Sequence, residues 1–153
     1  MRTVRVTERF EGTVPEAERC WYDTARWPHW VEGLGRIERV DAEWPAAGAT
    51  VVWESGPAGR GRVTEHVLAH EPLRGQTLEV EDDSIRGRQS VTFMPADPGV
   101  EVALELEYEL RRNSIPMRIT DLLFIRRAMT DSLRITVGRF GVELEAARRG
   151  RRS

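Results

Sequence analysis

The sequence predicts an α+β protein in which an antiparallel sheet is covered by one long C-terminal helix. Three observations support this fold class. One strand-like segment and two short helical segments come first, a series of alternating segments divided by turns follows, and a long helical repeat ends the chain. The 153 residues fit a single domain spanning 1–153, because domains typically contain about 100–200 residues.

The first forty residues supply the opening elements. Residues 3–10 alternate apolar and polar side chains and are predicted to form a half-buried strand. A helix follows, with Thr13 as its N-cap and Pro15 in its first turn. This helix must end before Pro28, because the residue before a proline disfavours helical geometry. A second, short helical turn is expected to begin at Trp27.

Six further strands are predicted, divided by turns rich in Pro and Gly, and sequential strands are expected to pair. They cover residues 36–43, 49–55, 60–70, 76–82, 85–94 and 100–110. In the last of them apolar residues alternate with glutamates, so one face is packed and the other solvated. Within 60–70 the alternation is inconsistent, and Glu65, His66 and Leu68 are assigned to the face opposite Val63 and Val67.

The rest of the chain is predicted to be helical. Asn113 or Ser114 is the expected N-cap, and Pro116 sits in the first turn. Apolar residues then recur every three or four positions over about 45 Å at 1.5 Å per residue, long enough to cross the domain. They are Ile115, Ile119, Leu122, Met129, Leu133, Val137, Phe140 and Leu144.

Composition excludes several functional classes. The net charge is −2, whereas a general nucleic-acid binder would be far more basic. All 23 basic residues are Arg, which excludes Schiff-base chemistry on lysine. Cys20 is the only cysteine, and the three histidines lack the spacing of a zinc motif, so no metal and no cofactor is expected. Without a secretory signal or a long apolar stretch, the chain is predicted to be cytoplasmic, with no integral membrane association.

The segment 13–40 carries a recognisable pattern. Thr13-Val-Pro15 follows the first strand, Trp21 lies in the first helix, and Trp27-Pro-His-Trp30 precedes a glycine and a strand. Together with the element order, this resembles the START-like (SRPBCC) superfamily, also called the helix-grip or Bet v 1-like fold, and especially its bacterial polyketide cyclase/dehydrase branch. The resemblance implies a curved antiparallel sheet of about seven strands (β-α-α-β6-α) wrapped around the C-terminal helix, with an internal cavity.

That superfamily includes ligand carriers, lipid-transfer domains and aromatase/cyclases, so three functions are considered. The first is binding of a hydrophobic small molecule, lipid-, aromatic- or polyketide-like, in the internal cavity. The second is an aromatase/cyclase acting on a poly-β-ketone, for which Tyr108, Glu65, His66 and Arg126 are candidate catalytic residues. The third is a protein–protein interaction module with the same fold. A monomer or a homodimer is consistent with each of them.

The predicted ligand site follows from inward-facing stripes that carry isolated polar groups. A mostly apolar pocket with a few convergent polar groups is typical of small-molecule sites, and Gln89 and Tyr108 are the polar members of two such stripes. The tryptophans either line this site or only pack the helices onto the sheet, and Trp44 has no assigned role. The candidate ligand-binding residues are Trp27, Trp30, Trp53, Gln89, Val91, Phe93, Leu104, Leu106, Tyr108, Leu122, Met129 and Leu133.

Overall fold

The computed structural model describes residues 1–57, 59–111 and 119–152, with the side chains of all of these except 119–122 and 152. The order of the elements agrees with the one predicted from the sequence. They are β1 (Arg2–Phe10), α1 (Val14–Tyr22), the 3₁₀ turn η1 (Thr24–Arg26), α2 (Trp27–Trp30), β2 (Leu34–Val40), β3 (Thr50–Ser55), β4 (Arg62–Glu71), β5 (Gly75–Glu81), β6 (Ile85–Pro95), β7 (Val100–Leu110) and α3 (Ile119–Arg152).

The strands form one seven-stranded antiparallel sheet in the order β1-β7-β6-β5-β4-β3-β2. Strands β2 to β7 are therefore a meander of sequence neighbours, which confirms the expected pairing. The first strand returns to the far edge and pairs with β7, so that Val6 lies opposite Leu104. Two predicted strands are displaced by one to three residues: β2 covers Leu34–Val40 instead of 36–43, and β4 covers Arg62–Glu71 instead of 60–70.

Strand β7 shows how the sequence sets the register. Its apolar face is buried from Val100 to Tyr108, while Glu101, Glu105 and Glu107 are only half-buried. On the outer face Arg5 pairs with Glu105 at 3.1 Å. Burying one aliphatic side chain stabilises the fold by roughly 1.5–3 kcal/mol. A shift of β7 by one residue against its neighbours would lose several of these contributions and would bury the glutamates, so this register is strongly preferred.

Helix α1 is fixed at its start by a capping box. The hydroxyl of Thr13 accepts a hydrogen bond from the backbone N–H of Glu16, and the Glu16 carboxylate accepts one from the backbone N–H of Thr13. These two bonds satisfy donors that the first helical turn leaves free. The helix then buries Cys20 and Trp21 against the sheet. Burial raises the pKa of the Cys20 thiol to about 11, which is typical of an unreactive core cysteine.

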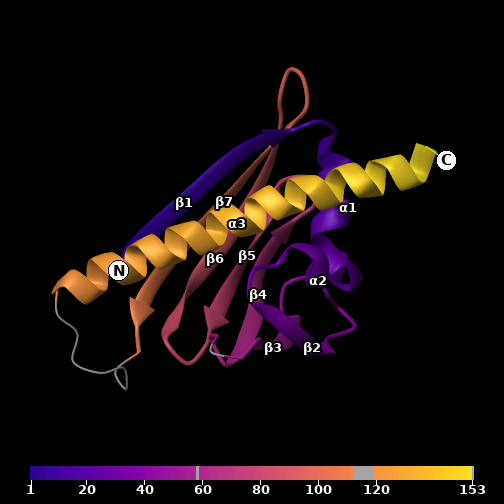
Figure 1. Ribbon diagram of the computed structural model, residues 1–153. Helices are drawn as coiled ribbons and strands as arrows, with labels where there is room; N and C mark the ends of the chain where they lie inside the picture. Colours follow the sequence, from indigo (N-terminus) through magenta and orange to yellow (C-terminus); the bar gives the residue numbers. More distant parts are fainter. Residues whose placement is uncertain (58, 112–118, 153) are drawn as a thin grey trace.

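Helix α3 crosses the sheet diagonally, passing β1 and then α1 (Figure 1). Leu133, Val137, Phe140 and Leu144 form its buried face, as the helical spacing predicts. Gly141 allows close contact with β1, because a Cβ there would lie 2.3 Å from the ring of Phe10. The predicted caps Asn113 and Ser114 lie outside the described residues. None of the described helices is long and apolar enough to span a membrane.

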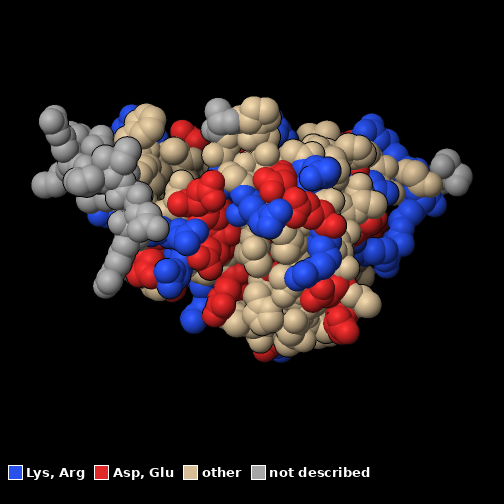
Figure 2. Space-filling model, turned by 90° about the horizontal axis from the view of Figure 1, so that it is seen from below, with Lys and Arg blue, Asp and Glu red and all other residues tan. Residues whose placement is uncertain are grey.

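Charged side chains of both signs alternate over the face seen from below, and basic ones gather at the end of the molecule where α3 terminates (Figure 2). Several of these arginines are neutralised by neighbours. Arg148 lies 3.4 Å from Glu16, and Arg149 lies 3.9 Å from Glu145. The positive charges at this end therefore complement nearby carboxylates and the negative end of the α3 dipole.

Candidate ligand-binding site

All five tryptophans gather beneath α3, although they come from four different parts of the chain. Trp21 is on α1, Trp27 and Trp30 are on α2, Trp44 lies between β2 and β3, and Trp53 is on β3. The ring centroids of Trp21 and Trp30 are 4.6 Å apart, and those of Trp27 and Trp44 are 5.5 Å apart. Tilted and edge-to-face pairs of this kind add to the stability gained from burial. Trp44, which the sequence left unexplained, is therefore part of the cluster.

Four of the indole N–H groups of this cluster fall into two sets. Trp27 donates to the backbone carbonyl of Trp21, and Trp44 donates to that of Tyr22, both at 2.9 Å. These two bonds fix α2 and the β2–β3 loop to the end of α1. By contrast, the buried N–H of Trp30 has no hydrogen-bond partner in the part of the chain that the structure describes, and the N–H of Trp53 lies near the carboxyl of Glu65.

The same five tryptophans line a cavity of about 50 Å³ between the sheet and α3. Its volume suffices for a few water molecules, whereas sites for drug-sized ligands occupy about 300–1,000 Å³. The remaining lining residues come from the loop after α2, from the connection between β3 and β4, from β4 to β7 and from the middle of α3. They are Val31, Glu32, Arg60, Glu65, Gln76, Leu78, Gln89, Leu104, Ser132, Leu133 and Thr136.

Glu65 is the buried one among the ionisable residues that line this cavity. It is 8% exposed and shares the inner face of β4 with Val63 and Val67, which corrects the facing assigned to it from the sequence. Burial raises its pKa to about 7, against the opposing effects of the Arg60 charge and of the nearby indole N–H of Trp53. A carboxyl with this pKa can hold or release a proton near neutral pH.

Arg60 lies at the edge of the cavity and is held in place by a buried carboxylate. Its Nε is 2.5 Å from Oδ2 of Asp82, which is only 2% exposed. Asp82 also accepts hydrogen bonds from the backbone N–H groups of Ser84 and Ile85. The Arg60 guanidinium lies 5.7 Å from the centroid of the Trp53 ring, a cation–π arrangement. Arg60 is thus a fixed charge beside Trp53 and Glu65.

Two hydrogen bonds hold the segment after α2 against α3 where both border the cavity. Ser132 donates from its hydroxyl to Oε2 of Glu32 at 2.7 Å, and the backbone N–H of Glu32 donates to the hydroxyl of Thr136 at 3.1 Å. Glu32, Ser132 and Thr136 all line the cavity. We refer to these three residues as the latch, because separating them would widen the cavity.

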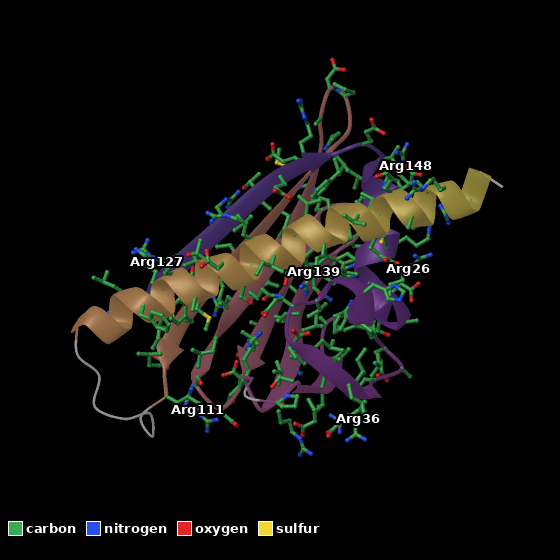
Figure 3. The ribbon with its side chains drawn as sticks, in the orientation of Figure 1. Arg26, Arg36, Arg111, Arg127, Arg139 and Arg148 are labelled. Atoms are coloured by element: carbon green, nitrogen blue, oxygen red, sulfur yellow. The ribbon has the colours of Figure 1, made fainter. Side chains whose placement is uncertain are left out.

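A second polar contact joins α2 to α3 further along the helix. Arg26 lies beside α3, between the positions of Arg139 and Arg148 in Figure 3, and its guanidinium is 2.7 Å from Oε1 of Glu143. Nδ1 of His29 is 3.2 Å from the same carboxylate. Although burial alone would raise the pKa of Glu143, these hydrogen bonds with His29 and Arg26 lower it. Glu143 therefore stays ionised and fastens α2 at this point.

The structure brings half of the predicted ligand-binding residues to the cavity: Trp27, Trp30, Trp53, Gln89, Leu104 and Leu133. Val91, Phe93, Leu106 and Tyr108 are buried in the surrounding core, and Met129 is half-buried against it. Phe93, for example, packs edge-on against Trp21 and Tyr22. The side chain of Leu122 lies outside the described residues.

The four candidate catalytic residues do not form one cluster. Glu65 lines the cavity. His66 points from the other face of β4, where its Nδ1 is 3.0 Å from the hydroxyl of Thr50. The phenol of Tyr108 is buried, and its pKa is raised by burial against the charges of Arg2 and Arg126. Arg126 itself is exposed on α3. Glu65 is therefore the candidate that the tryptophan cavity contains.

Several residues that line the cavity were not predicted from the sequence. Only some of them lie in a sequence pattern that could have identified them. Gln76 lies on the buried face of β5 with Leu78 and Val80, so strand alternation identifies it as an inward polar group. Arg60 and Glu32 come from connecting segments, which have no periodic pattern to reveal their direction. Among the described residues, no group of three or more His, Cys, Asp or Glu side chains is placed to hold a metal ion.

A wider groove of about 370 Å³ lies between α1 and the last turns of α3. Its charged side chains mostly pair with acids: Arg26 contacts Asp23 and Glu143, and Arg148 contacts Glu16. The tryptophan cavity is smaller, but it has aromatic walls, contains the buried carboxyl of Glu65 and is lined by Trp30, whose buried N–H has no partner among the described residues. Such groups are the usual mark of a place that water or a ligand completes, so we take this cavity as the candidate site.

An open antiparallel sheet with a long C-terminal helix across it, and a cavity between them, is the START-like helix-grip fold. The chain belongs to the family described as polyketide cyclase / dehydrase and lipid transport, whose model matches residues 1–145. This confirms the resemblance inferred from the sequence. Comparison with curated proteins finds no match.

Solved structures share the fold at low sequence identity. A START superfamily protein from Mycobacterium smegmatis has a TM-score of 0.72 and 11% identity, covering 94% of this chain and 97% of its own. The di-domain ARO/CYC StfQ of the steffimycin biosynthetic pathway has a TM-score of 0.76 and 14% identity, covering 97% of this chain and 52% of its own. Truncated norcoclaurine synthase from Thalictrum flavum has a TM-score of 0.67 and 8% identity, covering 92% and 91%.

Proposed function

We propose that this protein binds a hydrophobic small molecule, lipid-, aromatic- or polyketide-like, in the tryptophan cavity. The observation that carries the proposal is that all five tryptophans line one cavity together with the buried carboxyl of Glu65, and that the buried N–H of one of them, Trp30, has no partner among the described residues. Plain core packing gives no reason for these polar groups to meet at one place. Membership of a family that includes lipid transport supports the same function.

The size of the cavity sets a condition on this function. About 50 Å³ admits only a small part of such a ligand, so the site has to widen when it binds. The latch is the contact that we expect to separate, because Glu32, Ser132 and Thr136 line the cavity and only two hydrogen bonds among the described residues join Glu32 to α3 there. The contact of Glu143 with Arg26 and His29 keeps α2 attached to α3 while the latch opens.

Native mass spectrometry of the purified protein, alone and mixed with apolar aromatic compounds, tests the proposal. We expect a discrete adduct on the wild-type protein and its loss from Leu78→Phe, which adds volume inside the cavity. Met94→Phe, at an exposed position on β6, is the matched control and should retain the adduct. The proposal is wrong if no adduct forms, or if Leu78→Phe retains it as the control does.

A second candidate function is an aromatase/cyclase, and the pKa of Glu65 near 7 is the observation that favours it. A carboxyl poised near neutrality can take a proton from a carbon next to a carbonyl and return it to a leaving hydroxyl, as aldol condensation and dehydration require. Incubation with a poly-β-ketone from a minimal polyketide synthase is expected to yield a cyclised product. Glu65→Gln should lower the rate by about 10²–10⁴, and equal rates would exclude this role.

A further inference from the structure

Helix α3 has a second apolar face, on the side that points away from the sheet. Among the large apolar side chains that are exposed in the described residues, four are on this helix: Leu123, Phe124, Ile135 and Val142, which are 43–73% exposed. At about 100° per residue, Phe124, Ile135 and Val142 lie within about 20° of one line along the helix, on the side opposite the buried face. No described element lies over this line (Figure 1). We refer to these three residues as the outer stripe.

Small residues lie between the members of the outer stripe and leave space beside the helix. Ala128, Gly138 and Ala146 are exposed on the same side of α3. A glycine inside a helix destabilises it by about 0.5–1 kcal/mol relative to alanine, so it needs a reason. Gly141 has one in the ring of Phe10, whereas nothing described lies within 4 Å of a Cβ built at Gly138. Close approach of another backbone from outside would give Gly138 its reason.

The charges beside the outer stripe favour a second copy of this chain as the partner. Arg127 and Glu145 are exposed and 18 positions apart, which is five full turns at 3.6 residues per turn, so both project from the same flank of α3. Arg127 has no ion pair among the described residues, and Glu145 only approaches Arg149 at 3.9 Å. A second α3 running antiparallel, about a two-fold axis midway between them, would place each Arg127 against the Glu145 of the other copy.

We propose that two copies of this protein associate through the outer stripes of their α3 helices, packed antiparallel about a two-fold axis near position 136. Ile135 then meets its own symmetry mate, and Phe124 comes next to Ala146 of the second copy. Burial of the apolar side chains supplies the affinity, whereas the pairs of Arg127 with Glu145 select the antiparallel direction. The inference is independent of the proposed ligand binding, because the outer stripe faces away from the tryptophan cavity.

Sedimentation velocity of the protein at about 5 to 500 μM tests the association. A single pair of helices buries less than the roughly 1,200–2,000 Å² of a standard interface, so we expect a monomer–dimer equilibrium with a Kd on the order of 100 μM. Val142→Glu places an unpaired charge in the apolar contact and should raise this Kd at least about ten-fold. Met94→Glu, at an exposed apolar position on β6, is the matched control and should leave the equilibrium unchanged.

A charge exchange tests which residues face each other. Arg127→Glu and Glu145→Arg each place like charges opposite one another in the dimer, and each should raise the Kd by about three- to ten-fold. Both changes in one chain restore the opposite charges, so the Kd should return to within about two-fold of the wild-type value. All of these positions are exposed, so the fold of the single chain does not depend on them.

Single cysteines report the direction of packing. Ile135→Cys lies beside the two-fold axis and should form an intermolecular disulfide on mild oxidation. Val142→Cys lies about 18 Å from its symmetry mate, at 1.5 Å per residue, and should not. Cys20 does not interfere, because it is buried and its pKa is raised to about 11. Parallel packing would cross-link both variants.

The results that would overturn the inference are distinct. A wild type that stays monomeric up to about 500 μM would exclude the second copy, and binding of that monomer to phosphatidylglycerol vesicles would assign the outer stripe to a membrane surface instead. A dimer that Val142→Glu leaves intact would place the contact elsewhere on the molecule. Cross-linking of Val142→Cys, or a charge exchange that does not restore the affinity, would contradict the antiparallel arrangement.

Discussion

Glu65 illustrates how the environment of one residue decides its chemistry. An unremarkable position on an alternating strand becomes an ionisable group inside an aromatic cavity, because β4 faces it inward between Val63 and Val67. Arg60 is close enough to lower its pKa but is held mainly by Asp82, so burial prevails. The result is a carboxyl that folding keeps protonated well above its usual range.

This predicts a pH dependence of stability. In the unfolded chain the Glu65 carboxyl loses its proton near pH 4.5, whereas in the folded protein it does so near pH 7. Between these values the folded state binds the extra proton, so its contribution is full below about pH 4.5 and is lost as the pH rises through 7. The shift corresponds to at most about 3 kcal/mol.

Glu65→Gln is therefore expected to remove this decline and to raise the free energy of unfolding at pH 8 by about 2–3 kcal/mol. Urea unfolding at pH 5 and at pH 8 measures it. Glu79→Gln, on the exposed face of the neighbouring strand β5, is the control and should keep the wild-type slope. Equal slopes in Glu65→Gln and wild type would contradict the assignment.

At the scale of elements, α1 and α2 position most of the aromatic lining. The capping box starts α1, and the carbonyls at its end receive the indole N–H groups of Trp27 and Trp44. We expect Thr13→Ala to lower the free energy of unfolding by about 1 kcal/mol, measured by urea unfolding. Thr92→Ala, exposed on β6, is the control. An unchanged stability would mean that the box does not hold this end of the helix.

The latch makes a separate prediction about α3. Ser132→Ala combined with Thr136→Val removes both side-chain partners of Glu32. Each hydrogen bond lost should raise the population of the open form about five-fold. Because the five tryptophans line the cavity, acrylamide should then quench their fluorescence faster.

Thr130→Val is the matched control for the latch, since Thr130 is on the same helix and its hydroxyl donates to the Arg126 carbonyl. Quenching is expected to be the same in this control as in the wild type. If the double variant were quenched no faster than the control, the latch would not restrict access to the cavity.

At the scale of the whole molecule, the sequence predicts the fold better than the site. Strand alternation and helical spacing repeat over many residues, so the predicted strand ends differ from the observed ones by at most three residues, as at β2 and β4. The tryptophan cavity is assembled from separate segments, and nothing in the local pattern says that Trp44 and Trp53 meet Trp21 there. From the sequence alone, only residues on helices and strands, such as Gln89 and Leu104, could be assigned to the site.

Residues in the connecting segments show why the rest of the site could not be predicted from the sequence. Arg60 owes its place to the buried Asp82, which comes from the turn between β5 and β6, and Glu32 owes its place to hydroxyls on α3. These are contacts between residues from 22 to more than 100 positions apart. They follow from the completed fold and cannot be deduced from spacing.

The most direct test of the central claim is a titration of the protein with naphthalene, followed through tryptophan fluorescence, in the wild type, Leu78→Phe and Met94→Phe. We predict saturable binding at one site in the wild type and in Met94→Phe. Leu78→Phe, whose larger ring occupies the cavity, should bind at least about ten-fold more weakly, because overpacking a filled site costs about 1–3 kcal/mol. Equal affinity in all three proteins, or a response that never saturates, would contradict ligand binding in the tryptophan cavity.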